Sequence, residues 1–204
     1  MSPKEQIKAS AVKLFAEKGF FNTSAAEIAQ EAQVNLSTLY SFFADEEEII
    51  KDIFSSEWQK RHSFYVNIKN WHMDWFLKIN GILNFHLQEI QKEPELAIVI
   101  LTEQMNPRFR NQEPANKFSQ LALIISEILQ KAIEGGKIRP CNVEKTSLII
   151  YGFIETLTYE YILTKDLKKL EQTIDNFGLL LKNGLEIKAA TTDITTNFAT
   201  QELP

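Results

Sequence analysis

The sequence has few residues that interrupt helices and almost none that could form covalent cross-links. Its 204 residues include 6 Pro, 7 Gly and one cysteine, Cys141. Scarce proline and glycine favour long helices over many short strands and turns. A single cysteine excludes an intrachain disulfide framework and indicates a reducing, intracellular compartment. These shortages predict a helical protein whose core consists of apolar side chains.

The sequence also lacks the segments and motifs of several functional classes. Its longest strongly apolar run, residues 96–101, is far shorter than the roughly 20 residues that span a bilayer. The start of the chain lacks the apolar stretch of a signal peptide. No Walker A, G-x-S-x-G or G-x-G-x-x-G motif is present. We therefore expect a cytoplasmic protein with no membrane partner, no cofactor, no metal and no enzymatic activity.

Capping signals and apolar periodicity predict where the helices lie. Ser2 with Glu5 opens a first helix that ends near Gly19, and Ser24 with Glu27 opens a second. The fold class that follows is all-α, with a small three-helix head joined to a helical body and about nine helices in total. Further helices are predicted at residues 36–42, 45–70, 73–92, 115–134 and 167–187, with another after Asn142 and a short one within 93–114.

Residues 24–42 have the spacing of a helix-turn-helix motif, whose second helix enters the major groove of DNA. Leu39 and Phe43 would face the core of the head, and Tyr40 could bond a phosphate. The same spacing is also consistent with an ordinary corner of a three-helix bundle. The residues expected to face outward are Leu36, Ser37, Thr38 and Ser41.

The head resembles the DNA-binding domain of TetR-type transcriptional regulators. The likeness runs in register over residues 7–49 and includes LFAEKGF at 14–20, TS at 23–24, EIA at 27–29, Ala32, Val34 and TLYSFF at 38–43. It implies a homodimer, usually a repressor, that binds a palindromic double-stranded DNA operator and is released by a small apolar ligand. It places Ser24 and Tyr40 at phosphate contacts, and Leu36, Ser37 and Thr38 at base-facing positions.

The charge of the head departs from that family pattern. Residues 1–43 contain four Lys, four Glu and no Arg, so their charges cancel. Glu46 stands where the family commonly has Lys, and Phe42 stands where His or Tyr is common. Because cations supply much of the affinity for DNA, we expect weak or strongly salt-dependent binding. The alternative is a helical small-molecule-binding or interaction dimer with a vestigial head.

Aromatic side chains crowd the predicted fourth and fifth helices, where they could form core or line a pocket. Residues 94–97 with Glu103 and Arg108 resemble the body of the regulators that respond to fatty acids or acyl-CoA. That resemblance favours a pocket for a small apolar ligand. The candidate ligand-binding residues are Trp58, Tyr65, Trp75, Phe85, Met105, Phe109, Phe118 and Tyr151.

An apolar stripe near the C-terminus is the candidate dimer interface, although it could instead serve the core of a single chain. The stripe consists of Leu170, Ile174, Phe177, Leu181 and Leu185. We therefore divide the chain into a DNA-binding domain at residues 1–45, a ligand-binding and dimerisation domain at 46–188, and a mobile tail at 189–204.

Overall fold

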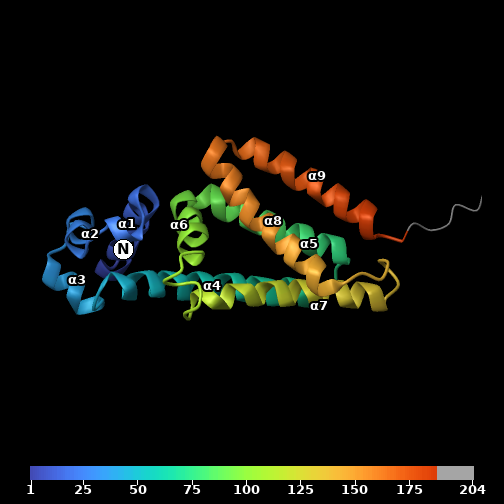
Figure 1. Cartoon of the computed structure of the whole chain (residues 1–204), viewed down its shortest axis with the longest axis horizontal. Helices are drawn as coiled ribbons and strands as arrows, with labels where there is room; N and C mark the ends of the chain where they lie inside the picture. Colours follow the sequence, from blue (N-terminus) through green and yellow to red (C-terminus); the bar gives the residue numbers. More distant parts are fainter. Residues whose placement is uncertain (188–204) are drawn as a thin grey trace, which may run out of the picture.

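The computed structural model describes residues 1–187 as an elongated all-α protein with a small head at one end (Figure 1). This confirms the predicted fold class, whereas the tail predicted at 189–204 lies outside the described residues. No helix within residues 1–187 has the length and apolar character needed to cross a membrane. The elements are α1 (Pro3–Lys18), η1 (Phe20–Asn22), α2 (Ala25–Glu31), α3 (Leu36–Phe42), α4 (Glu46–Asn70), α5 (Trp75–Lys92), α6 (Pro94–Gln104), η2 (Ala115–Gln120), α7 (Leu121–Glu134), α8 (Val143–Thr164) and α9 (Leu167–Leu185).

The head consists of α1, α2 and α3 packed around one apolar core. Both predicted capping boxes form, with the Ser2 and Ser24 hydroxyls accepting from the backbone N–H groups of Glu5 and Glu27. These side chains satisfy amide groups that the first turn of each helix would otherwise leave unpaired. The buried residues of the head include Ile7, Ala11, Phe15, Ile28, Leu39 and Phe43.

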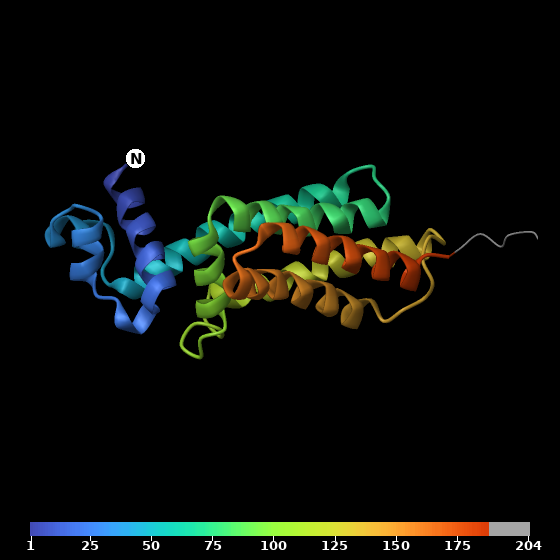
Figure 2. The same cartoon turned by 90° about the horizontal axis from the view of Figure 1, so that it is seen from above.

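Helix α4 connects the head to the body as one continuous rod (Figures 1 and 2). The Asp45 side chain caps its start by accepting from the backbone N–H of Glu48 at 2.8 Å. The first turns of α4 belong to the packing of the head, because Asp52 on α4 pairs with Lys4 of α1 at 2.8 Å. Because no flexible linker separates the two parts of α4, a motion of α4 within the body would also move the head.

In the body, α5 and α7 pack against α4, α8 packs against α7, and α9 packs against α5 and α8, while α6 lies between the body and the head (Figure 1). The predicted helix at 115–134 is wrong at its start, because residues 115–120 form the 3₁₀ segment η2. This segment has no side-chain cap, and Ser119 donates back to the Asn116 carbonyl at 2.8 Å. Such local bonds compete with regular helix.

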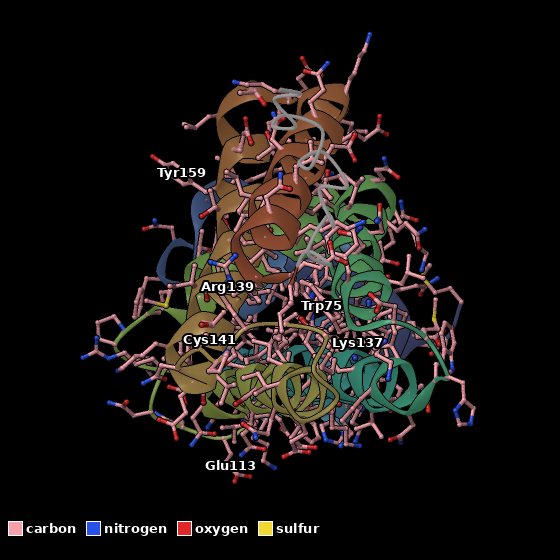
Figure 3. The ribbon with its side chains drawn as sticks, turned by 90° about the vertical axis from the view of Figure 1, so that its right-hand side faces the viewer. Trp75, Glu113, Lys137, Arg139, Cys141 and Tyr159 are labelled. Atoms are coloured by element: carbon pink, nitrogen blue, oxygen red, sulfur yellow. The ribbon has the colours of Figure 1, made fainter. Side chains whose placement is uncertain are left out.

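The far end of the body is held by the loop between α7 and α8, where Lys137, Arg139 and Cys141 lie (Figure 3). The backbone N–H of Arg139 donates to the Leu185 carbonyl at 2.8 Å. The backbone N–H of Ile187 donates to the Lys137 carbonyl at 3.2 Å. These two bonds tie the end of α9 to the loop.

Candidate DNA interface and ligand cavity

The turn between α2 and α3 is a Schellman motif built without glycine. The backbone N–H of Val34 donates to the Ala29 carbonyl at 3.0 Å, and that of Gln33 donates to the Gln30 carbonyl at 3.1 Å. Gln33 adopts the left-handed conformation, with φ of 55°. Asn35 then caps α3 by accepting from the backbone N–H of Thr38 at 2.7 Å. These bonds fix the angle between the two helices of the motif.

The outer face of α3 is the candidate DNA interface. The hydroxyls of Ser37 and Thr38 both donate to the Asn35 side chain at 2.7 Å, and the Ser41 hydroxyl donates to the Thr38 carbonyl. Tyr40 is 51% exposed, and its hydroxyl has no hydrogen-bond partner within residues 1–187. Tyr40 is therefore the side chain on α3 that is most ready to donate to a phosphate. The other predicted DNA contacts are Ser24 and Leu36, which are exposed, at the starts of α2 and α3.

Every lysine of the head is paired with a carboxylate. Asp52 accepts both Lys4 and Lys8, at 2.8 and 2.5 Å. The other pairs are Lys13 with Glu31 at 2.6 Å and Lys18 with Glu27 at 2.5 Å. The bonds from Lys18 and Ser24 lower the pKa of Glu27 to about 2, so this carboxylate remains charged near neutral pH. A phosphate must compete with these partners, so few lysines can release counterions from DNA. This favours weak binding with a shallow salt dependence, in place of the strong salt dependence expected from the sequence.

The acids at the start of α4 have structural roles that the sequence did not reveal. The Glu46 side chain accepts from the backbone N–H of Ala25 at 2.6 Å, and Glu48 accepts from that of Ala44 at 2.5 Å. Glu46 therefore acts as an additional cap at the start of α2. Glu46, which stands where the family commonly has Lys, therefore has its carboxylate bound within the head.

Head and body meet at the end of α6. Glu103 is buried and accepts from the backbone N–H of Phe20 at 3.2 Å and from the Asn106 side chain at 2.9 Å. The guanidinium of Arg108 lies 5.9 Å from the Phe21 ring centroid. Phe20 and Phe21 belong to η1, which leads directly into the helix-turn-helix. Movement of α6 would therefore displace the start of that motif.

A chain of aromatic contacts continues from this junction into the body. The Phe109 ring packs edge-on against Phe20, with centroids 4.9 Å apart, and against Phe54 at 6.2 Å. Phe54 packs in turn against Phe118 at 6.2 Å. Phe118 lines an internal cavity, so one series of packed rings joins that cavity to the head.

The cavity lies between α4, α5, α6 and α8 and has a volume of about 40 Å³. That volume holds roughly three water molecules, whereas typical ligand sites have about 300 Å³ or more. A larger ligand would therefore have to push the surrounding helices apart. The apolar lining residues are Ile90, Ala97, Ile100, Leu101, Phe118 and Ile154, and the polar ones are Arg61, His86, Glu89, Gln104, Tyr151, Glu155 and Thr158.

A buried polar network forms one wall of the cavity. Arg61 donates to Glu57 at 3.1 Å and to Nδ1 of His86 at 2.9 Å. Burial and the nearby charges of Arg61 and Lys60 hold the pKa of His86 well below its ordinary value, so the ring is neutral. Because arginine is only a donor, Nδ1 accepts and Nε2–H donates to the Tyr65 hydroxyl at 2.8 Å. Both ring nitrogens of His86 are thus engaged in hydrogen bonds.

Two comparisons identify the architecture of the chain. Residues 7–53 match the profile of bacterial regulatory proteins of the tetR family. The structure of FadR from Bacillus subtilis in complex with stearoyl-CoA superimposes with a TM-score of 0.74 and 24% identity, over 88% of this chain and 98% of that one. Residues 7–53 therefore resemble the DNA-binding head of tetR-family regulators. The helix-turn-helix assignment is thereby confirmed.

Two relatives that match this chain over most of its length are named as transcriptional regulators. An uncharacterized HTH-type regulator of Bacillus subtilis, YhgD, is 24% identical over 160 residues, which cover 78% of this chain and 83% of YhgD. The fatty acid metabolism regulator protein of the same organism is 23% identical over 188 residues, which cover 90% and 95% of the two chains. Both relatives are named as transcriptional regulators, which together with the match of the head supports a DNA-binding regulatory role.

The predicted ligand-binding residues of the regulator are only partly brought together. Phe118 and Tyr151 line the cavity, and Tyr65 lies behind it through His86. Met105 is 58% exposed, and Phe109 belongs to the contact between head and body. The other three predicted residues, Trp58, Trp75 and Phe85, are absent from the lining, and Trp75 lies at the far end of α5 (Figure 3).

The predicted dimer stripe of the regulator faces its own chain. Leu170 and Ile174 are buried, and Phe177 stacks on Phe153 of α8 with centroids 3.8 Å apart. The stripe is therefore corrected to the internal contact between α9 and the rest of the body. A different apolar face remains exposed and consists of Leu148, Ile149, Tyr159 and Leu163 on α8 with Leu179 and Leu180 on α9.

Sequence reasoning missed the charged wall of the cavity. Glu57 and Arg61 are buried on the same face of α4 as Phe54 and Tyr65. A signal was present, because charged residues at helical spacing within an apolar stripe are rarely buried without a partner. Gln104 and Glu155, which lie on other helices, offered no such signal.

Proposed function

We propose that this regulator binds a palindromic operator as a homodimer and releases it when a small ligand enters the cavity of the body. The observation that carries the proposal is the packed series Phe118–Phe54–Phe109–Phe20, which runs from the cavity to the helix-turn-helix. A ligand that enlarges the cavity would displace Phe118 or α6. Either movement would tilt the head relative to α4 and change the distance between the two reading helices of a dimer.

The ligand that we propose is a small, largely apolar molecule of the fatty acid or acyl-CoA class. Six apolar side chains line the cavity, which suits an aliphatic chain. The names of relatives support this class, since one is a fatty acid metabolism regulator and one structural neighbour holds stearoyl-CoA. The proposed division of labour is DNA binding by residues 1–45 and ligand binding with dimerisation by residues 46–188.

The exposed apolar face of α8 and α9 is the proposed dimer interface. Two copies of this helix pair would form a four-helix bundle about a two-fold axis. Tyr159 projects outward from α8 on this side of the molecule (Figure 3). Such a bundle would leave both heads free to reach successive major grooves.

Leu180→Glu tests this interface, because Leu180 is 72% exposed and lies on the proposed contact. A buried carboxylate at a dimer contact should raise the dissociation constant at least about thirtyfold, measured by sedimentation velocity over a concentration series. Leu123→Glu on α7, also exposed, is the matched control and should dimerise like the native chain. A dimer unaffected by Leu180→Glu would place the interface elsewhere.

The operator is tested by selecting bound fragments of the source genome at low salt and then titrating salt against the fragment that binds best. We expect a palindrome bound by a dimer, with a shallow salt dependence because the lysines of the head are paired.

Tyr40→Phe should weaken operator binding about fivefold through loss of one phosphate hydrogen bond. Ser119→Ala, which removes an exposed hydroxyl from η2 of the body, should leave DNA binding unchanged. Adding a ligand should lower operator affinity, and a rise would contradict release by ligand.

A second function is favoured by one observation, the pairing of all four lysines in the head. A helical ligand-binding dimer with a vestigial head would retain no particular sequence in the fragment selection. Salt would then abolish all retention of DNA, while ligand binding by the body would persist.

A further inference from the structure

The wall of the cavity offers hydrogen-bond donors that the chain itself does not satisfy. Arg61 is 7% exposed, and its Nε–H has no partner within the described residues. Tyr151 lines the same cavity, and burial together with the Glu155 carboxylate raises its pKa to about 12, so its hydroxyl keeps its proton. Buried donors normally have acceptors, so an unpaired guanidinium N–H in a cavity wall indicates an acceptor supplied from outside.

The neighbouring histidine does not supply that acceptor. His86 uses Nδ1 to accept from Arg61 and Nε2–H to donate to Tyr65. The Tyr65 oxygen therefore accepts, and its own hydrogen remains available as another donor directly behind the wall. Arg61 and Tyr151 thus place two hydrogen-bond donors on this side of the cavity, whereas Tyr65 lies behind the lining.

The charges around the cavity are already balanced. Glu57 pairs with Arg61 at 3.1 Å and with Lys60 at 2.7 Å, and Lys60 also pairs with Glu89. Glu155 adds a further carboxyl group to the lining. A ligand carboxylate would bring an unmatched negative charge beside these carboxyl groups in a partly open cavity, which carries a desolvation and repulsion penalty. A neutral oxygen that accepts hydrogen bonds avoids this penalty.

We propose that the cavity recognises the neutral carbonyl oxygen of an apolar ligand, such as an ester, a thioester or a ketone, in preference to a free carboxylate. The proposal deepens the proposed function, because it takes the cavity as the site of the releasing ligand. The present volume of about 40 Å³ suits the carbonyl group itself. The hydrocarbon part would extend by displacing the apolar lining beside Ile100 and Phe118.

The test uses the full chain without DNA and three probes of matched length at pH 7.5, with binding measured by isothermal titration calorimetry. Methyl decanoate has a neutral carbonyl, decanoic acid is a carboxylate, and decyl methyl ether has no carbonyl. We expect methyl decanoate to bind at least about tenfold more tightly than either of the others. Equal or tighter binding of decanoic acid, or no binding of methyl decanoate, would overturn the proposal.

Three variants test whether the preference for the neutral carbonyl depends on Arg61 and Tyr151 in the cavity wall. Arg61→Lys keeps the charge opposite Glu57 but removes the Nε–H, and it should weaken methyl decanoate binding about tenfold. Tyr151→Phe should weaken it about threefold, whereas Tyr159→Phe, exposed on the same helix, should not change it. Thermal melting checks that each variant is folded. If Arg61→Lys does not fold, the result for Tyr151→Phe decides the test. An unchanged ester-to-acid ratio in the folded cavity variants would refute the assignment.

Two further probes separate the possible sources of the carbonyl. S-methyl thiodecanoate and decanoyl-coenzyme A carry the same thioester without and with a nucleotide, and their relative affinity identifies the preferred source. Because these titrations contain no DNA, failure of the carbonyl preference and failure of operator binding are observed separately.

Discussion

The head and the body bury different kinds of residue. The core of the head is apolar, and its lysines and glutamates pair at the surface or cap helices. The body buries Glu57, Arg61 and His86 in one connected network beside a cavity. Exposed pairs contribute little to stability, whereas buried charges are costly unless fully partnered. The difference supports the proposal that the cavity of the body, and not the head, receives a polar group of a ligand.

The contact that joins the two regions should give the largest effect when broken. Phe109 is almost fully buried between Phe20 and Phe54. Phe109→Ala should lower the free energy of unfolding by about 3–5 kcal/mol, measured by urea denaturation. Met105→Ala, four residues away and exposed, should change it by less than about 0.5 kcal/mol. Equal effects of the two substitutions would show that Phe109 does not hold head and body together.

A matched pair of carboxylate substitutions compares the two regions directly. Glu57→Gln leaves the buried Arg61 without its charge partner and should cost about 3 kcal/mol in the free energy of unfolding. Glu31→Gln breaks the exposed pair with Lys13 and should cost less than about 1 kcal/mol. Denaturation at neutral pH measures both. A larger cost in the head would reverse the contrast.

The two regions should also lose stability in different pH ranges. His86 has a lowered pKa in the folded chain, so below its ordinary value of 6.5 the unfolded chain binds more protons. Stability should therefore fall as the pH drops below 6.5, by up to about 1.4 kcal/mol per pH unit. His86→Asn should flatten this slope, whereas His72→Asn, on an exposed loop, should not.

Glu27 in the head should change the stability of the protein less than His86 does, and at a lower pH. Its pKa is lowered from 4.5 to about 2, so its contribution is present above 4.5 and is lost as the pH falls towards 2. Thermal melting of native and Glu27→Gln chains between these values should converge at low pH. A difference that persists at pH 2 would mean that the Glu27 side chain acts through contacts other than its charge.

Much of the fold could be predicted from local sequence signals. Ser2 and Ser24 were recognisable caps, and each accepts the expected backbone N–H group. Capping depends on residues three apart in the chain, so it is visible without tertiary structure. The outward direction of Tyr40 and the inward direction of Leu39 follow from the same periodicity.

The ligand site could be predicted less well from the sequence. Aromatic residues indicated a pocket, yet Trp75, Phe85 and Met105 do not line the cavity. Aromatic side chains fill cores and line pockets with the same spacing, so their pattern cannot distinguish the two uses. The dimer interface was predicted at the wrong stripe for a similar reason. The sequence of an apolar stripe on α9 does not show whether the same chain or a second copy covers it.

The sequence by itself determined the helices, the helix-turn-helix and the neutral charge of the head, because these depend on neighbours within one or two helical turns. Only the tertiary structure decided which charges are bound internally and which groups meet at the cavity. Glu46 reaches Ala25, and Arg61 reaches His86, across 21 and 25 residues of chain. Such contacts depend on how whole helices pack, and packing is set by the complete core rather than by any local segment.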